Sequence, residues 1–515
     1  MEFSLLYSSL SLVIFLVAFK LFLQIRSSNH KNHPPSPRAL PILGHLHLLN
    51  KEPLHRTLHA LSEKYGSVFS LQFGSRNVIV VSSPSAAEEC LNKNDIVFAN
   101  RPRLIMGKYI GYNSTILVSS SYGDHWRNLR RISAVEIFSS SRLNMFLGIR
   151  REEIKILLEK LVSKSVEPPM ISSNGGFAKV ELRPMFSELL FNIVMRMVTG
   201  KRYYGGKDGG EEGKEFRELI EEMFEYAGAS NPADFLPILK WFDYQGLVKR
   251  AVSIGKKMDS FLQGLIDEQR NAAATAEESR NTMISHLLVL QQSQPDYYTD
   301  EIIKGLVTVI LLGATDTSAV TLEWTMSNLL NHPSVLKKAG AEIESVLDPD
   351  QLMDEPDLSK LHYLQNIILE TLRLYPTGPL LIPHLSSDDC TVEGYHIPGD
   401  TMLIVNAWAI QRDPKYWDDP TSFKPERFES GESMGYKLMP FGRGRRACPG
   451  EGMAQRVLGL TLGLLIQCFD WTRVDDKEVD MRDGKGLTMP RVVPLEAMCK
   501  ARPIFNKAFS KAAAA

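Results

Sequence analysis

The stretch FGRGRRACPG, from Phe441 to Gly450, surrounds a single cysteine with three glycines and three arginines. The apolar segment that follows it predicts a helix, so Cys448 would lie just ahead of a helix N-terminus. The positive end of that helix and the nearby arginines would lower the pKa of the thiol and favour the thiolate. Gly444, Pro449 and Gly450 would allow a tight loop. Such a loop can hold one thiolate against a large, flat ligand.

Other chemistries were weighed for the same loop. A zinc site would need further cysteine or histidine ligands at short spacing, and covalent haem attachment would need C-x-x-C-H; neither pattern surrounds Cys448. The run GRGRRA matches the dinucleotide fingerprint G-x-G-x-x-A, but no good β-strand is predicted before it. Taken alone, Cys448 also fits a nucleophile or a buried structural cysteine.

An acid and an alcohol, Asp316 and Thr317, interrupt an otherwise apolar segment. The spacing predicts one long helix with Thr299 as its N-cap and Asn331 near its end. Its middle, GATDTS, is rich in small and hydroxylated residues that compete for backbone hydrogen bonds. We expect the helix to open locally there and to direct a proton-delivery pair into a cavity. A polar patch on a solvated helix face is the alternative.

A second charged pattern is Glu370 with Arg373, three residues apart on a predicted helix, and Arg427 in the later run PERF. A glutamate bridged by two arginines would fix the later segment to the helix. Either piece alone is better explained as ordinary surface charge, which contributes little to stability.

The first residues of the chain are strongly apolar. The run from Phe3 to Ile25 carries one charge, Lys20, and as a helix it would be about 35 Å long, enough to cross a bilayer. Basic residues follow it, which predicts a cytosolic body. A cleaved signal peptide and a buried core helix are the alternatives. We therefore expect an anchor helix at 1–26, a proline-rich hinge at 27–45, a single catalytic body at 46–505 and a tail at 506–515.

Composition narrows the class of protein. The 515 residues include 59 Lys and Arg against 60 Asp and Glu, a net charge of −1, so no basic excess supports nucleic-acid binding. Five scattered cysteines are odd in number, which argues against a disulfide framework and for a reducing compartment.

Taken together, these motifs resemble those of a known family. Phe441, Gly444, Arg446, Cys448 and Gly450 fit F-x-x-G-x-R-x-C-x-G, the haem-thiolate loop of cytochrome P450 enzymes. The runs WRNLR, GATDTS, ETLR and PERF resemble further family motifs in the right order, and YPTGPLLIPH is similar to plant microsomal isoflavone 2′-hydroxylase-like members. The resemblance implies a mainly α fold, a triangular prism with a small β region, preceded by an N-terminal transmembrane helix.

The resemblance also implies roles for individual residues. Cys448 would bind the iron of haem b (iron protoporphyrin IX), and Asp316 and Thr317 would deliver protons during oxygen activation. Glu370, Arg373 and Arg427 would form the structural lock. Further haem contacts would come from Trp126, Arg130, His384, Phe441, Arg446 and Gly450. His384 is equally well explained as an ordinary loop histidine, and Phe441 as core packing.

By the same resemblance, the chain would be a monooxygenase of a plant phenolic metabolite of the flavonoid, lignan or benzophenone type. Hydroxylation is expected first; oxidative phenol coupling or methylenedioxy-bridge formation is the alternative. A non-catalytic haem-thiolate protein is the rival class, and the pair Asp316–Thr317 argues against it. Ala314 departs from the family's usual glycine and would crowd the oxygen groove. Substrate contacts are expected from Ala314, Thr377, Leu380, Leu381, Leu487 and Thr488.

Partners and location follow from the resemblance as well. Electrons would come from NADPH through a separate cytochrome reductase, with Arg443 and Arg445 as candidates for its docking face. Ordinary solvated charge is the alternative for these two arginines. The other partners would be O2, a small phenolic substrate and membrane lipid, with no nucleic acid. We expect a monomeric catalytic unit on a single-pass anchor in the endoplasmic reticulum membrane, with the catalytic body facing the cytosol.

Overall fold

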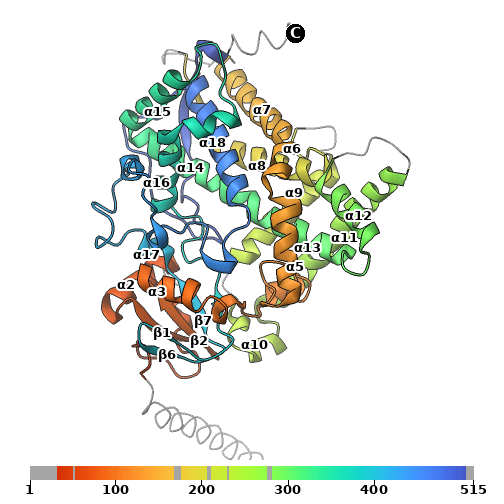
Figure 1. Cartoon of the computed structure of the whole chain (residues 1–515), viewed down its shortest axis with the longest axis vertical. Helices are drawn as coiled ribbons and strands as arrows, with labels where there is room; N and C mark the ends of the chain where they lie inside the picture. The colour runs from red at the N-terminus through yellow and green to blue at the C-terminus, as the bar shows by residue number, and fades with distance from the viewer. Residues whose placement is uncertain are drawn as a thin grey trace, which may run out of the picture.

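A computed structural model describes residues 32–49, 53–166, 176–205, 210–228, 231–274 and 281–505. The expected anchor helix at 1–26, the start of the hinge and the tail at 506–515 lie outside these residues. Most of the described chain is helical (Figure 1). The longer helices are α2 (Leu54–Tyr65), α5 (Asp124–Ile132), α7 (Leu147–Val166), α8 (Leu182–Thr199), α9 (Glu211–Gly228), α11 (Leu247–Ala274), α12 (Met283–Ser293), α13 (Asp300–Ala314), α14 (Asp316–Asn331), α15 (Pro333–Val346), α16 (His362–Leu374) and α18 (Glu451–Cys468). The shorter ones are α3 (Pro84–Glu88), α4 (Ile105–Tyr109), α6 (Ser140–Met145), α10 (Ile238–Trp241) and α17 (Ala407–Ile410).

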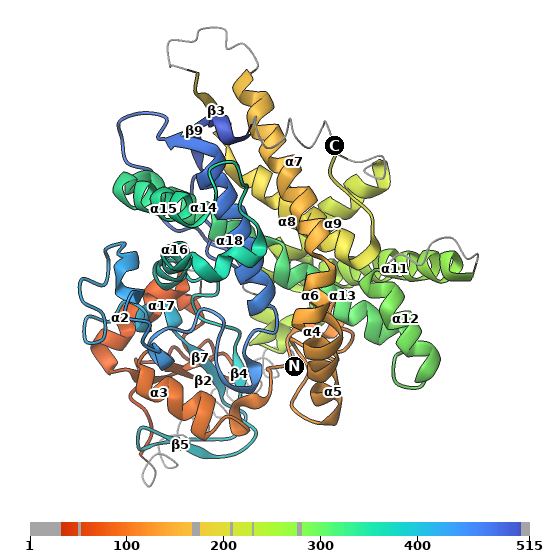
Figure 2. The ribbon, with the colours of Figure 1, turned by 45° about the horizontal axis from the view of Figure 1, so that its top comes forward.

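The strands form three small sheets in the described chain. A four-stranded sheet has the order β1-β2-β7-β4, a three-stranded sheet the order β3-β9-β8, and β5 pairs with β6. Only β2 and β7 pair in parallel. The four-stranded sheet lies at one end of the molecule, and β3 and β9 lie at the other, beside α7 (Figure 2). The strands are β1 (Val68–Phe73), β2 (Arg76–Val81), β3 (Ala178–Glu181), β4 (His384–Leu385), β5 (Cys390–Val392), β6 (Tyr395–Ile397), β7 (Met402–Val405), β8 (Phe469–Thr472) and β9 (Glu496–Ala501).

Both faces of the four-stranded sheet are buried, which explains its unbroken apolar runs. Alternate side chains of β2 and β7 point to opposite faces. Ile79 and Leu403 join one apolar cluster, and Val80 and Ile404 join another. Part of the predicted hinge is attached to the same sheet, because the Ser70 backbone N–H donates to the Pro35 carbonyl at 2.8 Å. The folded body therefore begins before residue 46, the boundary predicted from the sequence.

The long central helix forms as predicted and opens where predicted. Thr299 is its N-cap, accepting a hydrogen bond from the Ile302 backbone N–H at 3.3 Å. Helix α13 ends at Ala314 and α14 begins at Asp316, with Thr315 at φ −85° and ψ −67° between them. The Thr315 hydroxyl donates to the Leu311 carbonyl at 2.8 Å, the competition with the helix ladder that the sequence implies.

The run Asp300–Asn331 is also, among the described residues, the one helical segment long and apolar enough to cross a membrane. Two thirds of its most apolar window (67%) is buried inside the protein. It packs against α8, α16 and α18, so it forms the centre of the helical core.

Candidate functional site

The cysteine loop is shaped by two glycines with left-handed backbone. Gly442 and Gly444 have φ of 69° and 70°, and a Cβ on Gly444 would lie 2.3 Å from the Leu91 carbonyl oxygen, so that position requires glycine. The Cys448 backbone N–H donates to the Phe441 carbonyl at 2.8 Å, which closes the loop. Gly450 has φ −90°, which other residues also adopt, so the tight turn expected there does not depend on glycine.

The thiol of Cys448 is accessible although protein surrounds it. Its side chain is exposed, yet burial raises its pKa, outweighing the backbone N–H group of Gly450 and the charge of Arg130. The prediction that the loop lowers the pKa of the free thiol is therefore wrong, because desolvation exceeds the helix and arginine effects. An accessible thiol with a pKa raised by burial fits a group that lines an internal space.

The central helix has an accessible surface at its opening too. Gly313 is exposed near the end of a mostly buried helix, and a Cβ built on it would meet nothing within 4 Å. Helix α14, which begins three residues later, packs against α18, which follows Cys448. The opening of the helix and the thiol loop thus belong to adjoining elements.

Three buried or half-buried arginines gather near the thiol, and no described carboxylate is paired with any of them. Burial and the charge of Arg446 lower the pKa of Arg101 to about 9, and burial and the charge of Arg130 lower that of Arg446 to about 10. Arg446 donates to three backbone carbonyls, those of Ala99, Leu117 and Ser120, at 2.6–3.2 Å.

The other two arginines have donors to spare. The Arg101 Nε has no partner in the described chain. Arg130 makes no hydrogen bond or ion pair with any described residue, and burial lowers its pKa. Unpaired, desolvated guanidinium groups call for an anionic ligand. The two carboxylates of haem would satisfy them, so this donor set fits the expected group.

Trp126 and His384 border this cluster. The Trp126 indole Nε1–H donates to the Leu117 carbonyl at 3.2 Å, and the Arg446 guanidinium lies 4.3 Å from its ring centroid. His384 is buried in β4, with Nδ1 2.8 Å from the Phe98 carbonyl oxygen. Burial and the neighbouring arginines hold its pKa well below the usual value. Phe441 packs against the main helical core.

Arg101 is the member of the cluster that sequence reasoning missed. It lies in the run NRPR, and no periodicity or spacing marks its guanidinium as buried. Its Nη1 donates to the carbonyls of Ile382 and Pro383 at 2.7 and 2.8 Å. Its placement beside Arg446 depends on the contact between the segment before α4 and the segment before β4, which the sequence does not display.

Asp316 and Thr317 lie at the start of α14 but are not bonded to each other. The Thr317 hydroxyl donates to the Gly313 carbonyl at 2.6 Å. The Asp316 carboxylate accepts from the Thr488 hydroxyl at 2.6 Å, and burial raises its pKa. A carboxyl group with a raised pKa holds its proton closer to neutral pH, as a proton donor requires.

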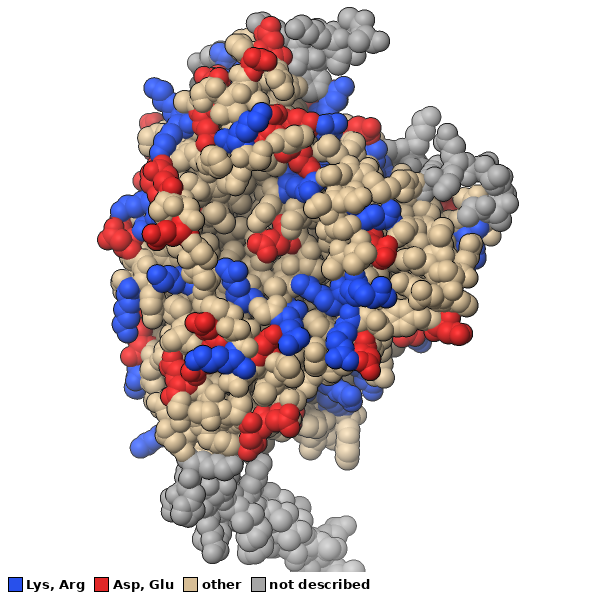
Figure 3. All heavy atoms as spheres, in the orientation of Figure 1, with Lys and Arg blue, Asp and Glu red and all other residues tan. Residues whose placement is uncertain are grey.

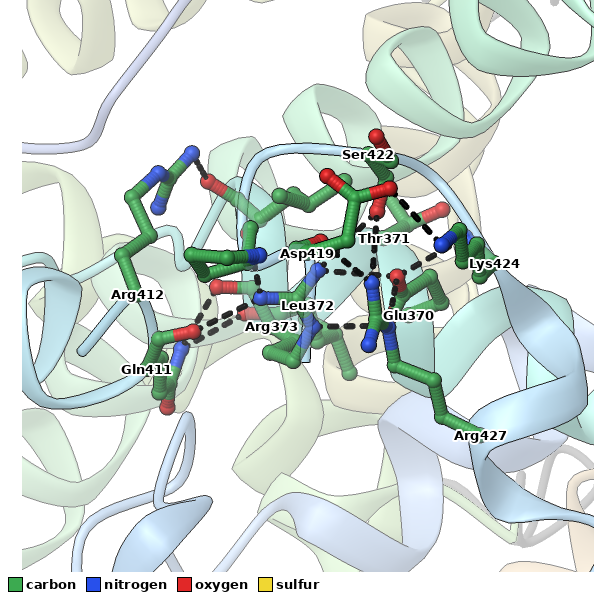
Figure 4. Close-up of polar contacts among 12 residues, drawn as sticks. Glu370, Thr371, Leu372, Arg373, Gln411, Arg412, Asp419, Ser422, Lys424 and Arg427 are labelled. Atoms are coloured by element: carbon green, nitrogen blue, oxygen red, sulfur yellow. Dashed lines mark hydrogen bonds and ion pairs between the residues drawn. The ribbon is translucent and has the colours of Figure 1, made fainter. Parts of the chain in front are cut away.

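Glu370, Arg373 and Arg427 come together in one buried cluster (Figure 4). Arg373 donates Nε and Nη2 to the Glu370 carboxylate at 2.7 and 2.8 Å, and both side chains are fully buried. Arg427 Nε donates to the same carboxylate at 3.1 Å. The Lys424 backbone N–H adds a bond at 2.9 Å. The cluster fixes the segment before the cysteine loop to α16.

The residues expected at a substrate pocket come from three segments. Ala314 ends α13 and is half-buried, and the Thr377 hydroxyl lies 3.1 Å from that of Thr321 on α14. Leu380 and Leu381 pack against the two clusters of the four-stranded sheet. In the third segment, Leu487 is 47% exposed and Thr488 is bonded to Asp316.

The whole chain is similar to several known proteins. The family model for Cytochrome P450 matches residues 34–494. Isoflavone 3′-hydroxylase of Medicago truncatula is 55% identical over 98% of this chain and 99% of its own, and isoflavone 2′-hydroxylase of Glycyrrhiza echinata is 52% identical over 97% and 98%. (+)-Piperitol/(+)-sesamin synthase of Sesamum radiatum is 49% identical over 98% of both. A zebrafish cytochrome P450 structure with progesterone is similar in fold, with a TM-score of 0.71 at 23% identity, over 88% of this chain and 100% of that one.

Proposed function

This chain belongs to the cytochrome P450 family, and we propose that it hydroxylates a plant phenolic specialised metabolite of the flavonoid, lignan or benzophenone type. Membership makes it a haem-dependent oxidoreductase of the plant isoflavone hydroxylase-like branch, which excludes the non-catalytic alternative. The phenolic substrate class is supported by relatives above 50% identity that are named for isoflavone hydroxylation. The single structural observation behind the proposal is the unpaired arginine cluster beside an accessible cysteine.

Haem b is the cofactor of the family. In this chain Cys448 would bind the iron, and Arg101, Arg130 and Arg446 would bind the carboxylates, with Trp126 and His384 at the edge of that cluster. When bound, haem activates O2 with electrons delivered by a redox partner. The haem carboxylates would then pair with guanidinium groups that are desolvated and otherwise lack a counter-charge.

Two side chains at the start of α14 would manage protons. Asp316 would hold a proton at its carboxyl group, because burial raises its pKa. Thr317 would pass it on from its hydroxyl group, which in this structure donates to the Gly313 carbonyl. The accessible surface at Gly313 would leave room for small groups beside that hydroxyl.

Ring closure is the second candidate outcome, either oxidative phenol coupling or methylenedioxy-bridge formation. The relative named for (+)-piperitol and (+)-sesamin synthesis, at 49% identity, favours it. Ala314, in place of the usual glycine, would press a substrate more closely against the reacting centre.

For location, we propose an endoplasmic reticulum anchor with a cytosolic body. An exposed apolar patch supports contact between that body and a membrane. The patch comes from two segments, residues 40–43 and residues 238–244. Both segments are held near the β1–β2 turn, where the Gly74 backbone N–H donates to the Leu43 carbonyl at 3.2 Å and that of Ser75 to the Phe235 carbonyl at 2.9 Å. Trp241 is 87% exposed. The other members of the patch are Leu40, Ile42, Leu43, Ile238, Phe242 and Tyr244.

The family works with a redox partner, and we propose an NADPH–cytochrome reductase that docks on a basic face. Lys and Arg side chains form a band across the face shown in Figure 3. Arg443 and Arg445 are exposed within the cysteine loop itself. Arg445 is paired with Asp95 at 3.1 Å, and Arg443 donates to the carbonyls of Gly435 and Leu438 at 3.0 Å. Arg443 keeps its positive charge at the surface because its partners are neutral carbonyls, whereas Asp95 partly balances the charge of Arg445.

The proposed reaction is tested by incubating the protein, in microsomes that contain the reductase, with a panel of plant phenolics. Product masses identify the chemistry, because hydroxylation adds one oxygen and ring closure removes two hydrogens. We expect NADPH-dependent product from at least one flavonoid-like member of the panel. Turnover of terpenoids or fatty acids with no phenolic product would refute the proposed substrate class.

A further inference from the structure

The acid of the proposed proton-delivery pair has one hydrogen-bonding partner among the described residues. The Thr488 hydroxyl donates to Asp316 Oδ2 at 2.6 Å. Thr317 is turned away from it, toward the carbonyl of Gly313. The carboxyl group is therefore oriented by a segment that follows it in the chain by 172 residues, and not by the alcohol next to it.

The segment that carries Thr488 is itself fixed to α14. The backbone N–H of Met489 donates to the Thr377 carbonyl at 3.0 Å, and its carbonyl accepts from the Trp324 indole N–H at 2.8 Å. Met489 and Trp324 are both buried, at 1% and 0% exposed. Because Trp324 and Asp316 belong to the same helix, the Thr488 hydroxyl is held at a set position relative to the carboxyl group.

On its other side, the segment reaches toward open space and α9. Leu487 is 47% exposed. A Cβ placed on Gly228, the last residue of α9, would lie 2.6 Å from the Leu487 backbone nitrogen, so the two backbones are in close contact. Thr488 thus lies between a residue available to a ligand and a residue anchored in the core.

The hydrogen bond from Thr488 is the main polar contact of the Asp316 carboxylate, because the nearby charged residue does not pair with it. Arg183 acts on Asp316 only through its field. Its guanidinium is paired with Glu323 at 2.9 Å and donates to the Arg491 carbonyl at 2.8 Å. Burial raises the pKa of Asp316, and the bond from Thr488 opposes that rise.

We propose that Thr488 is a positioning residue for proton delivery, whose hydroxyl holds the Asp316 carboxyl group and connects it to the ligand-facing side of the loop. The role of Asp316 in proton delivery rests on the proposed function, whereas the contact itself does not. A ligand that displaces Leu487 would move Thr488 and release or reorient the carboxyl group. Proton delivery would then depend on whether the site is filled.

The first test reads the carboxyl group directly, without turnover. Infrared spectra of haem-loaded protein are recorded against pH in the absence of reductase and NADPH, and Asp316→Asn identifies the Asp316 band. Thr488→Val should raise the midpoint of that band, since it removes a bond that stabilises the carboxylate. Thr488→Ser should restore it. An unmoved midpoint in Thr488→Val would overturn the proposal.

Matched controls separate this effect from lost packing. Thr325→Val removes a buried threonine hydroxyl from α14 itself, one that donates to the Thr321 carbonyl at 2.7 Å. This variant should leave the Asp316 band unchanged. Thr488→Ala removes the hydroxyl without new branching and replaces Thr488→Val if that variant does not fold. A midpoint shift of equal size in Thr325→Val would assign the effect to packing and overturn the proposal.

The second test measures product formed per NADPH consumed, with the reductase and any substrate found in the panel. Thr488→Val should lower this ratio about threefold, the effect of losing one ordinary hydrogen bond, with a smaller change in KM. In an Asp316→Asn background the same substitution should have no further effect. A loss that persists in that background would make Thr488 a direct substrate contact and overturn the proposal. Absence of any oxidised substrate would count against the proposed function, and the infrared result would still decide the role of Thr488.

Discussion

Two buried clusters of arginine differ in how their charge is balanced. In one, Arg373 and Arg427 share the carboxylate of Glu370, and the remaining Arg373 donor bonds to the carbonyls of Gln411 and Pro420 at 2.7 and 2.8 Å. In the other, Arg101, Arg130 and Arg446 have no carboxylate hydrogen-bonded to them among the described residues, and their pKa values are lowered by burial. The first cluster is complete within the chain, and we propose that an anionic ligand completes the second.

The difference separates structural charge from binding charge. A buried ion pair that the chain satisfies by itself serves the fold, because removing one partner leaves the other charge unpaired. A desolvated cation without a partner lowers the stability of the protein until a ligand pairs with it. The two clusters should therefore respond to substitution with opposite dependence on haem.

The largest effect is expected at the complete cluster. Glu370→Gln should lower the free energy of unfolding by about 3–5 kcal/mol with or without haem, because Arg373 keeps a buried charge without a counter-charge. The matched control is Glu429→Gln, an exposed acid that pairs with Lys338 at 2.9 Å; its cost should stay below about 1 kcal/mol. Denaturant unfolding followed by circular dichroism measures both. Equal costs for the two variants would remove the distinction between the clusters.

A smaller effect of a different kind is expected at the open cluster. Arg130→Met should weaken haem retention about tenfold, the loss of one charge-assisted hydrogen bond. The haem-free protein should be as stable as before or more stable, because a desolvated charge is removed. Haem transfer to an acceptor protein gives the first quantity and thermal unfolding the second. The neighbouring exposed Arg131 provides the control, Arg131→Met, with no change in either. Destabilisation of the haem-free Arg130→Met protein would contradict the account.

The smallest effect concerns Asp316, a half-buried acid with a hydroxyl partner and, among the described residues, no paired cation. Because burial raises its pKa, the folded protein binds this proton more tightly than the unfolded chain. Its contribution to stability therefore falls as pH rises from the ordinary carboxyl range through the raised pKa. Relative to the wild-type protein, Asp316→Asn should therefore have a higher free energy of unfolding at pH 8 than at pH 4.

Thermal unfolding across pH checks this sign. The exposed Asp476 gives the control Asp476→Asn, which should show no such dependence. A stability gain for Asp316→Asn that grows toward acid pH would reverse the sign and refute a raised pKa.

Patterns confined to one segment allowed the most reliable predictions from sequence. The N-cap at Thr299, the opening at GATDTS and the helix after Cys448 depend on neighbours within one or two turns, and each forms as expected. The spacing of Glu370 and Arg373 likewise placed both on one helix face. That Arg427 also contacts Glu370 was expected from the family resemblance. Helix spacing could not predict this contact, because Arg427 follows Glu370 by 57 residues.

The burial of a side chain and its partners from distant segments could not be predicted from local sequence patterns. Arg101 carries no sequence sign of its burial. The helix and arginines around Cys448 suggested a lowered pKa, whereas the structure shows desolvation dominating. The partner of Asp316 was unpredictable for the same reason, because Thr488 reaches it from a segment near the end of the chain. The attachment of Pro35 to the backbone of Ser70 was not visible in the sequence either, because it joins the hinge to a later strand.

We propose that Cys448 binds haem iron while the open arginine cluster binds the haem carboxylates. The absorption spectrum of reduced protein with carbon monoxide, compared between the wild-type protein and Cys448→Ser, tests this assignment without intermediate steps. We predict a thiolate-type band for the wild type and, in Cys448→Ser, loss of that band together with loss of substrate oxidation. A Cys448→Ser protein that keeps both the band and the activity would contradict the assignment.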